Sequence, residues 1–201
     1  MQQVVPRMHP VPDERTRREP LSARLVVSLD RRIYRIARHW LAAANTILAG
    51  WLAALVLAPL LRLAGSPTLA RPIYALFSLL CHQDPSRSFA VGGHPLACCH
   101  RCAALYGASA AAGVGYATLR GRIRRAHRHE LAALLGPIVV DGLGGMSGLW
   151  ESTTLSRLAT GSLAGIGLVW LLYPYLEAGF ARVRTRLETL FARLAAEGRF
   201  Q

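Results

Sequence analysis

All four cysteines of the chain fall between residues 81 and 102, together with three of its histidines. They are Cys81, Cys98, Cys99 and Cys102, with His82, His94 and His100 among them. Thiolate and imidazole groups are the ligands that zinc prefers in proteins. If Cys99 and Cys102 begin a helix, their i, i+3 spacing places both thiols on one face. With Cys81 and either His82 or His94, the set predicts a tetrahedral Cys₃His zinc site, for which we favour His82.

The same thiols fit two other chemistries. Cys99-x-x-Cys102 at a helix N-terminus, with Arg101 and His100 inside it, resembles a redox pair with lowered thiol pKa values. Such a pair could exchange with Cys81, as in membrane oxidoreductases of the vitamin K epoxide reductase type, which hold a quinone beside a C-x-x-C. In the third reading the cysteines only staple a loop, in a non-enzymatic assembly or lipid-binding protein. The sequence alone leaves all three open.

Several charged side chains are expected near the thiols. They stand where a charge is costly to place in a membrane or where it could take part in catalysis. Asp141 interrupts an apolar run, and a carboxylate at the centre of a membrane span costs about 3 kcal/mol on insertion scales. Its candidate partners are a bound cation or an arginine at position 87, 101 or 157. In a catalytic version of the site, Asp141 or Glu151 would serve as general base, and Arg87 or Arg157 would clamp an anion. The structural alternative is an interhelix hydrogen bond for Asp141 and a Glu151–Arg157 pair at the interface.

The elements that must position these groups are apolar helices. Hydrophobic residues make up 52% of the chain and charged residues only 17%, against about 25% charged in soluble domains. A helix needs about 20 apolar residues to cross a bilayer. Four runs qualify, and a fifth, 72–81, is short enough to be an interfacial or re-entrant segment. We therefore predict an all-α, polytopic transmembrane bundle with spans at 40–61, 102–119, 131–150 and 158–176.

Positive charge is concentrated at the ends of these runs. The formal net charge is +13, and arginines crowd the segments 24–38, 120–128 and 182–193. Positive residues favour the cytoplasmic side of a membrane. We therefore predict a multi-pass plasma-membrane protein with both termini cytoplasmic, where the basic segments meet anionic lipids. The loops 62–101 and 150–157 then share the external face, and no nucleic-acid partner is expected.

Three segments follow from this layout. Residues 1–38 form a basic, partly disordered N-terminal segment without a signal peptide, residues 39–178 form the bundle, and residues 179–201 form a basic amphipathic helix. Within the bundle, two small-x-x-x-small pairs predict close helix packing. They are Gly144 with Gly148, and Gly161 with Gly165.

The polar motifs also resemble those of a prokaryotic membrane-protein family, domain of unknown function 2085. The resemblance covers about residues 72–170. The matching motifs are Cys81-His82-Gln83, Pro85, Arg87-Ser88-Phe89, Gly93, Cys99-x-Arg101-Cys102, Tyr106-Gly107, Pro137, Asp141-Gly142, Glu151-Ser152-Thr153, Arg157 and Thr160-Gly161. Gly144-Gly145 replaces a Thr-Gln pair usual there, Thr154 replaces a common Asn, and Cys98 is an additional thiol. The resemblance implies a shared external site and carries no established reaction. That site would be built from Cys81, His82, Gln83, Arg87, Cys99, Cys102, Asp141, Glu151 and Arg157.

Overall fold

The computed structural model describes residues 21–196, and helices dominate it. The described residues form five α-helices, a short 3₁₀ turn at Pro85–Arg87 and a two-stranded hairpin. The helical class predicted from the apolar runs is confirmed. The helices are α1 (Leu21–Leu63), α2 (Pro67–Ser78), α3 (His100–Thr118), α4 (Arg128–Met146) and α5 (Thr154–Ala196), and the strands are β1 (Ala90–Val91) and β2 (His94–Pro95).

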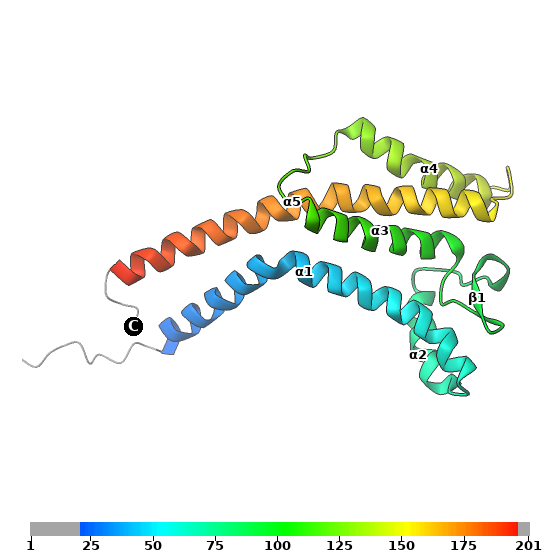
Figure 1. Cartoon of the computed structure of the whole chain (residues 1–201), viewed down its shortest axis with the longest axis horizontal. Coiled ribbons are helices and arrows are strands. Elements are labelled where there is room, and N and C mark those ends of the chain that lie inside the picture. The colour runs from blue at the N-terminus through cyan, green and yellow to red at the C-terminus, as the bar shows by residue number, and fades with distance from the viewer. Residues whose placement is uncertain (1–20, 197–201) are drawn as a thin grey trace, which may run out of the picture.

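The helices form an elongated bundle with two different ends (Figure 1). Helix α5 runs beside α3 and α4, while α1 packs against α3, α5 and α2. The hairpin, α2 and the turn between α4 and α5 gather at one end. The described ends of α1 and α5 project beyond the bundle at the opposite end, toward which the basic α3–α4 connection also turns. The cysteines therefore lie at one end of the described bundle and the basic segments at the other, while the side of a membrane that each end faces stays a prediction.

Two helices of the described chain, α1 and α5, are long and apolar enough to cross a membrane by length and composition. Each has 43 residues, or about 64 Å at 1.5 Å per residue, so each exceeds the ~30 Å hydrocarbon thickness. Helices α3 and α4, which carry the other two expected spans, have 19 residues each, and neither is apolar enough to qualify by the same criterion of length and composition. Helix α3 is rich in Ala and Gly, and α4 contains Arg128, Glu130 and Asp141.

Several boundaries differ from the expected segments. The basic segment expected at 1–38 is helical from Leu21 and continuous with α1, while residues 1–20 lie outside the described residues. The amphipathic stretch expected at 179–201 continues α5 as far as Ala196, and residues 197–201 are likewise outside. The interfacial segment expected at 72–81 is α2, which begins earlier, at Pro67, and ends at Ser78.

An apolar core supports the loop that carries the cysteines. Phe77 of α2 is fully buried between α1 and α3, where its ring lies 4.6 Å from that of Trp51 and 6.4 Å from that of Tyr106. The hairpin docks on the end of α1 through its two-residue Gly92-Gly93 turn. Both glycines have positive φ, at +56° and +80°, as a type I′ turn requires. A side chain at Gly92 would also collide with Leu63.

Polar side chains lock the basic end. Glu177 of α5 accepts hydrogen bonds from Trp40 of α1, at 2.9 Å, and from Arg120 after α3, at 2.8 Å. Asn45 of α1 donates to the Gly113 carbonyl of α3 at 3.0 Å and accepts from the Tyr173 hydroxyl of α5 at 2.9 Å. Three helices are therefore tied together away from the cysteine end.

The glycine pair Gly161 and Gly165 is confirmed as a close-packing face. An added Cβ at either position of α5 would collide with backbone carbonyls of α3, those of Arg101 and Leu105 respectively. The expected role of Gly148 in helix packing is wrong, because α4 ends at Met146 and Gly148 takes a φ of +73° just beyond it. Glycine in that left-handed conformation ends a helix without a Cβ penalty.

We expect Gly165→Ala to destabilise the bundle by about 1–3 kcal/mol, since overpacking of this contact forces α3 and α5 apart. Gly50→Ala in α1 is the matched control, because a Cβ there meets nothing within 4 Å. The control should be neutral or stabilising by up to about 1 kcal/mol, as alanine is the better helix former. Unfolding of the purified proteins in detergent measures both. Equal stability of the two variants would contradict the packing role of Gly165.

Candidate metal centre and pocket

Three thiols converge at the end of the bundle. The sulfurs of Cys81, Cys99 and Cys102 all lie within 4.8 Å of one another. Cys81 follows α2, Cys99 is the N-cap residue of α3 and Cys102 is in its first turn. Sulfur ligands in a tetrahedral zinc site, at about 2.3 Å from the metal, are about 3.8 Å apart. The observed spacing therefore needs little adjustment to surround one ion.

Backbone amides already face these sulfurs. The N–H of Cys99 donates to Sγ of Cys81 at 3.2 Å. The pKa of Cys99 is lowered, first by hydrogen bonds from the thiols of Cys102 and Cys81 and then by the backbone amides of Cys102 and Arg101. Hydrogen bonds to the charged form of a group favour that form, and a thiolate is the form that binds metal. The start of α3 therefore favours negative charge on the Cys99 sulfur.

Cys98 has a different environment from its neighbour Cys99. Its side chain is fully buried in the apolar core with Leu55 and Phe77, and burial raises its pKa. A buried thiol of this kind behaves as a small apolar side chain. The structure therefore brings Cys99, and not Cys98, to the other two sulfurs.

The histidines stand outside the three-sulfur group. His82 is exposed and lines the adjoining pocket, but it is not a member of the group. His94 lies in β2, half-buried. His100 is buried at the start of α3, with its ring 4.4 Å from that of Phe89. The sequence reading that favoured His82 as a fourth ligand stays a prediction.

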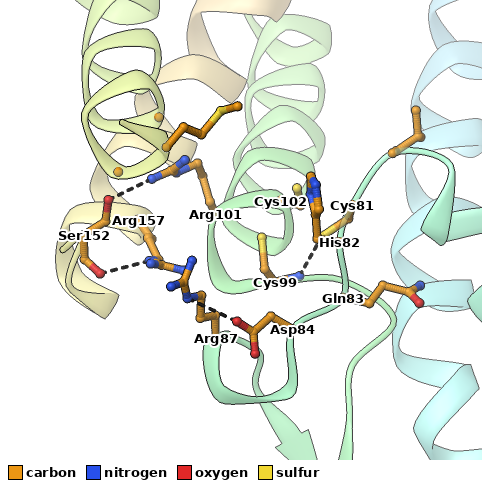
Figure 2. A pocket seen from close by; sticks show the side chains of 14 residues that line it. Cys81, His82, Gln83, Asp84, Arg87, Cys99, Arg101, Cys102, Ser152 and Arg157 are labelled. Carbon is orange, nitrogen blue, oxygen red and sulfur yellow. Dashed lines mark hydrogen bonds and ion pairs between the residues drawn. The ribbon is translucent and has the colours of Figure 1, made fainter. Parts of the chain in front are cut away.

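A pocket of about 500 Å³ opens beside the thiols (Figure 2). Its walls come from the loop after α2, the start of α3, the end of α4 and the start of α5. One side carries Cys81, Cys99 and Cys102, and the other carries arginines from three different elements. The lining residues are Leu80, Cys81, His82, Gln83, Asp84, Arg87, Cys99, Arg101, Cys102, Gly142, Gly145, Met146, Ser152 and Arg157.

Asp141 finds its partner in Arg101, one of the candidates expected from the sequence. The guanidinium of Arg101 forms an ion pair with the Asp141 carboxylate and also donates to Ser152 Oγ at 3.2 Å. The two side chains are only 23% and 12% exposed. Small residues on α4 make room for this contact, since a Cβ at Gly142 would lie 3.4 Å from Arg101 Nη1 and one at Gly145 would lie 3.2 Å from Ser152 Oγ. The pair joins α3 to α4: Arg101 lines the pocket, and Asp141 lies behind it.

Arg87 and Arg157 come from different elements and lie on the same side of the pocket, across from the thiols. Nε of Arg87 pairs with the Asp84 carboxylate at 3.2 Å, and Nε of Arg157 donates to the Ser152 carbonyl at 3.1 Å. The pKa of Asp84 is lowered, first by hydrogen bonds from Ser86 and also by the charges of both arginines. Figure 2 shows the two guanidinium groups pointing toward one another.

Gln83 and Glu151, two more residues of the expected site, differ in their surroundings. The Gln83 side-chain amide donates to the carbonyls of Tyr74 and Ala97, at 2.7 and 2.8 Å, so it ties α2 to the loop before α3. Glu151 is exposed on the α4–α5 turn and forms no ion pair with any described residue. Asp84 was missed from the sequence; the signal for it was Arg87 three residues later, the spacing of their ion pair.

The chain has features expected of a helical membrane protein: two described helices are long and apolar enough to cross a membrane, and the basic segments and the cysteine loop lie at opposite ends of the bundle. It belongs to the family described as predicted membrane protein, DUF2085, which matches residues 81–171. That segment includes every cysteine and both halves of the arginine pocket. The resemblance seen in the motifs is therefore confirmed.

Two archaeal relatives support this membership. An uncharacterized protein of Methanocaldococcus jannaschii is 35% identical over 104 residues, covering 51% of this chain and 67% of the relative. An uncharacterized protein of Methanothermobacter thermautotrophicus is 38% identical over 96 residues, covering 47% of this chain and 86% of the relative. No solved structure matches the chain significantly.

Proposed function

We propose that this protein is a multi-pass membrane protein whose three cysteines bind one zinc ion, with the fourth metal position open to the pocket. The convergence of the Cys81, Cys99 and Cys102 sulfurs is the observation that carries the proposal. Soft thiolate sets select zinc, copper(I) or iron–sulfur clusters. A single ion among three sulfurs, with room for a fourth ligand, suits the tetrahedral coordination of zinc.

The open position gives the centre a chemical use. Zinc with three protein ligands keeps its fourth site for water or substrate and acts as a Lewis acid. Here that site would face Arg87 and Arg157, which stand across the pocket as cationic clamps for an anionic ligand. Asp141 would position Arg101 and, being behind the wall, would not act as a base itself. Glu151 has no role in this arrangement.

We also propose that α3 and α4 span the membrane beside α1 and α5. Their 19 residues correspond to about 28 Å, and Asp141 within α4 is neutralised by Arg101. The arginine-rich ends favour cytoplasmic termini in the plasma membrane, with anionic lipids against them. The thiols and pocket then lie at the external face.

Metal analysis tests the centre. Protein purified in detergent without imidazole should contain about one zinc per chain by mass spectrometry. Its three clustered thiols should react with maleimide only after chelation. A protein without metal, whose thiols are paired in disulfides, would overturn the proposal, and a Cys99–Cys102 disulfide that cycles with quinone would favour the redox alternative.

Cysteine labelling tests the topology. Glu151→Cys and Arg122→Cys place exposed thiols at the two ends of the bundle. In intact cells a maleimide that cannot cross membranes should label Glu151→Cys, and should label Arg122→Cys only after permeabilisation, each relative to the unsubstituted protein. The reverse pattern would overturn the orientation, and labelling of both from one side would overturn the four spans.

A further inference from the structure

We propose that the pocket binds the phosphate headgroup of an anionic lipid, with Arg87 and Arg157 on the phosphate and the acyl chains leaving over Leu80 and Met146. In the proposed metal centre, the anionic ligand of the pocket has no stated chemical class; here it is an anionic lipid. It rests on the arginines and on the apolar rim, and so it does not depend on the metal.

The arginines present unused hydrogen-bond donors. Only Nε of Arg87 and of Arg157 is engaged, by Asp84 and by the Ser152 carbonyl respectively. Their Nη groups donate to no other residue of the described chain. Two guanidinium groups that point toward one another repel unless an anion lies between them, and planar guanidinium forks match phosphate oxygens in bidentate fashion.

One arginine of the pocket wall forms no ion pair with a described residue. Three arginines lie on this wall: Arg87, Arg101 and Arg157. Asp84 pairs with Arg87 and Asp141 pairs with Arg101, whereas Arg157 influences Asp84 by its charge without an ion pair. A phosphate headgroup would give Arg157 an anionic partner and would also reach Arg87, which is 56% exposed.

The rim of the pocket favours a lipid over free phosphate. Leu80 and Met146, which line it, are 60% and 86% exposed. Leu79, next to Leu80, and Leu149, three residues after Met146, are 79% and 74% exposed. A volume of about 500 Å³ suits a headgroup, whereas lipid tails would have to continue outside along this apolar surface, from which they exclude water.

Lipid binding to the full-length protein in detergent tests the inference. Native mass spectrometry would compare short-chain phosphatidic acid with phosphatidylcholine of the same chain length and with inorganic phosphate. The double variant Arg87→Gln/Arg157→Gln removes both clamps. Arg71→Gln is the matched control, since Arg71 is an exposed arginine of α2 that does not line the pocket and lies outside the basic segments.

Phosphatidic acid should bind in preference to phosphatidylcholine, and the double variant should weaken that binding about tenfold or more. Arg71→Gln should bind like the parent protein. Unchanged affinity in the double variant, or the same loss in Arg71→Gln, would overturn the site. Competition by inorganic phosphate at equal concentration would overturn the lipid source. Zinc content measured in the same samples separates these outcomes from a failure of the metal centre.

Discussion

Replacing Cys99 with serine should reduce bound zinc from about one ion per chain to almost none, with affinity at least about 100-fold lower. Cys99 is the N-cap of α3, and its sulfur lies within 4.8 Å of the two others. A serine hydroxyl stays protonated at neutral pH and is a poor zinc ligand. Two remaining sulfurs cannot hold the ion against a chelator. Mass spectrometry of the purified variant, with competition against a chromophoric chelator, measures both quantities.

Cys98→Ala is the matched control, one residue away in sequence. Cys98 is fully buried among apolar side chains, so its loss should lower stability modestly and leave zinc content unchanged. Zinc retained in Cys99→Ser would contradict the three-cysteine centre. Zinc lost from a folded Cys98→Ala protein would show that the wrong thiol of the adjacent pair has been assigned.

Asp141→Asn should destabilise the protein by about 2–4 kcal/mol, because it leaves the charge of Arg101 in the bundle without a counter-ion. Breaking a fully buried ion pair costs about 3–5 kcal/mol, and the partial exposure of this pair, 12% and 23%, reduces that figure. Unfolding in detergent, followed by circular dichroism, provides the measurement.

Two further variants isolate the cause. Asp84→Asn removes an acid from an ion pair whose side chains are 41% and 56% exposed, and it should cost less than about 1 kcal/mol. Asp141→Leu combined with Arg101→Met removes both charges and should recover much of the stability lost in Asp141→Asn. If Asp141→Asn were as stable as Asp84→Asn, the Arg101–Asp141 pair would not be what joins α3 to α4.

The helices were predictable because lipid-compatible runs are long and uninterrupted. The expected spans 40–61 and 158–176 lie inside α1 and α5, and 102–119 nearly coincides with α3. The full length of α1 and α5 could not be predicted from the apolar runs, because the basic residues that extend both helices are good helix formers and give no signal for a helix end. The hairpin at 90–95 also escaped, because its strands have only two residues each.

The thiol cluster was predictable from spacing, and the rest of the site was not. The i, i+3 relation of Cys99 and Cys102 required one face, but adjacent Cys98 and Cys99 differ only in which side of the chain meets the core. The Arg101–Asp141 pair joins residues 40 positions apart, and several arginines competed for that partner. The prediction that Gly148 packs between helices was wrong because a glycine that ends a helix can have the same spacing in sequence as one that packs inside it.

Zinc K-edge X-ray absorption on the purified protein tests the central claim most directly. The proposed centre predicts three sulfur ligands at about 2.3 Å and one nitrogen or oxygen ligand at about 2.0 Å. His82→Ala should leave three sulfurs in place, whether its imidazole or water supplies the fourth ligand. A first shell of four sulfurs, or one without sulfur, would contradict a three-cysteine zinc centre that opens onto the arginine pocket.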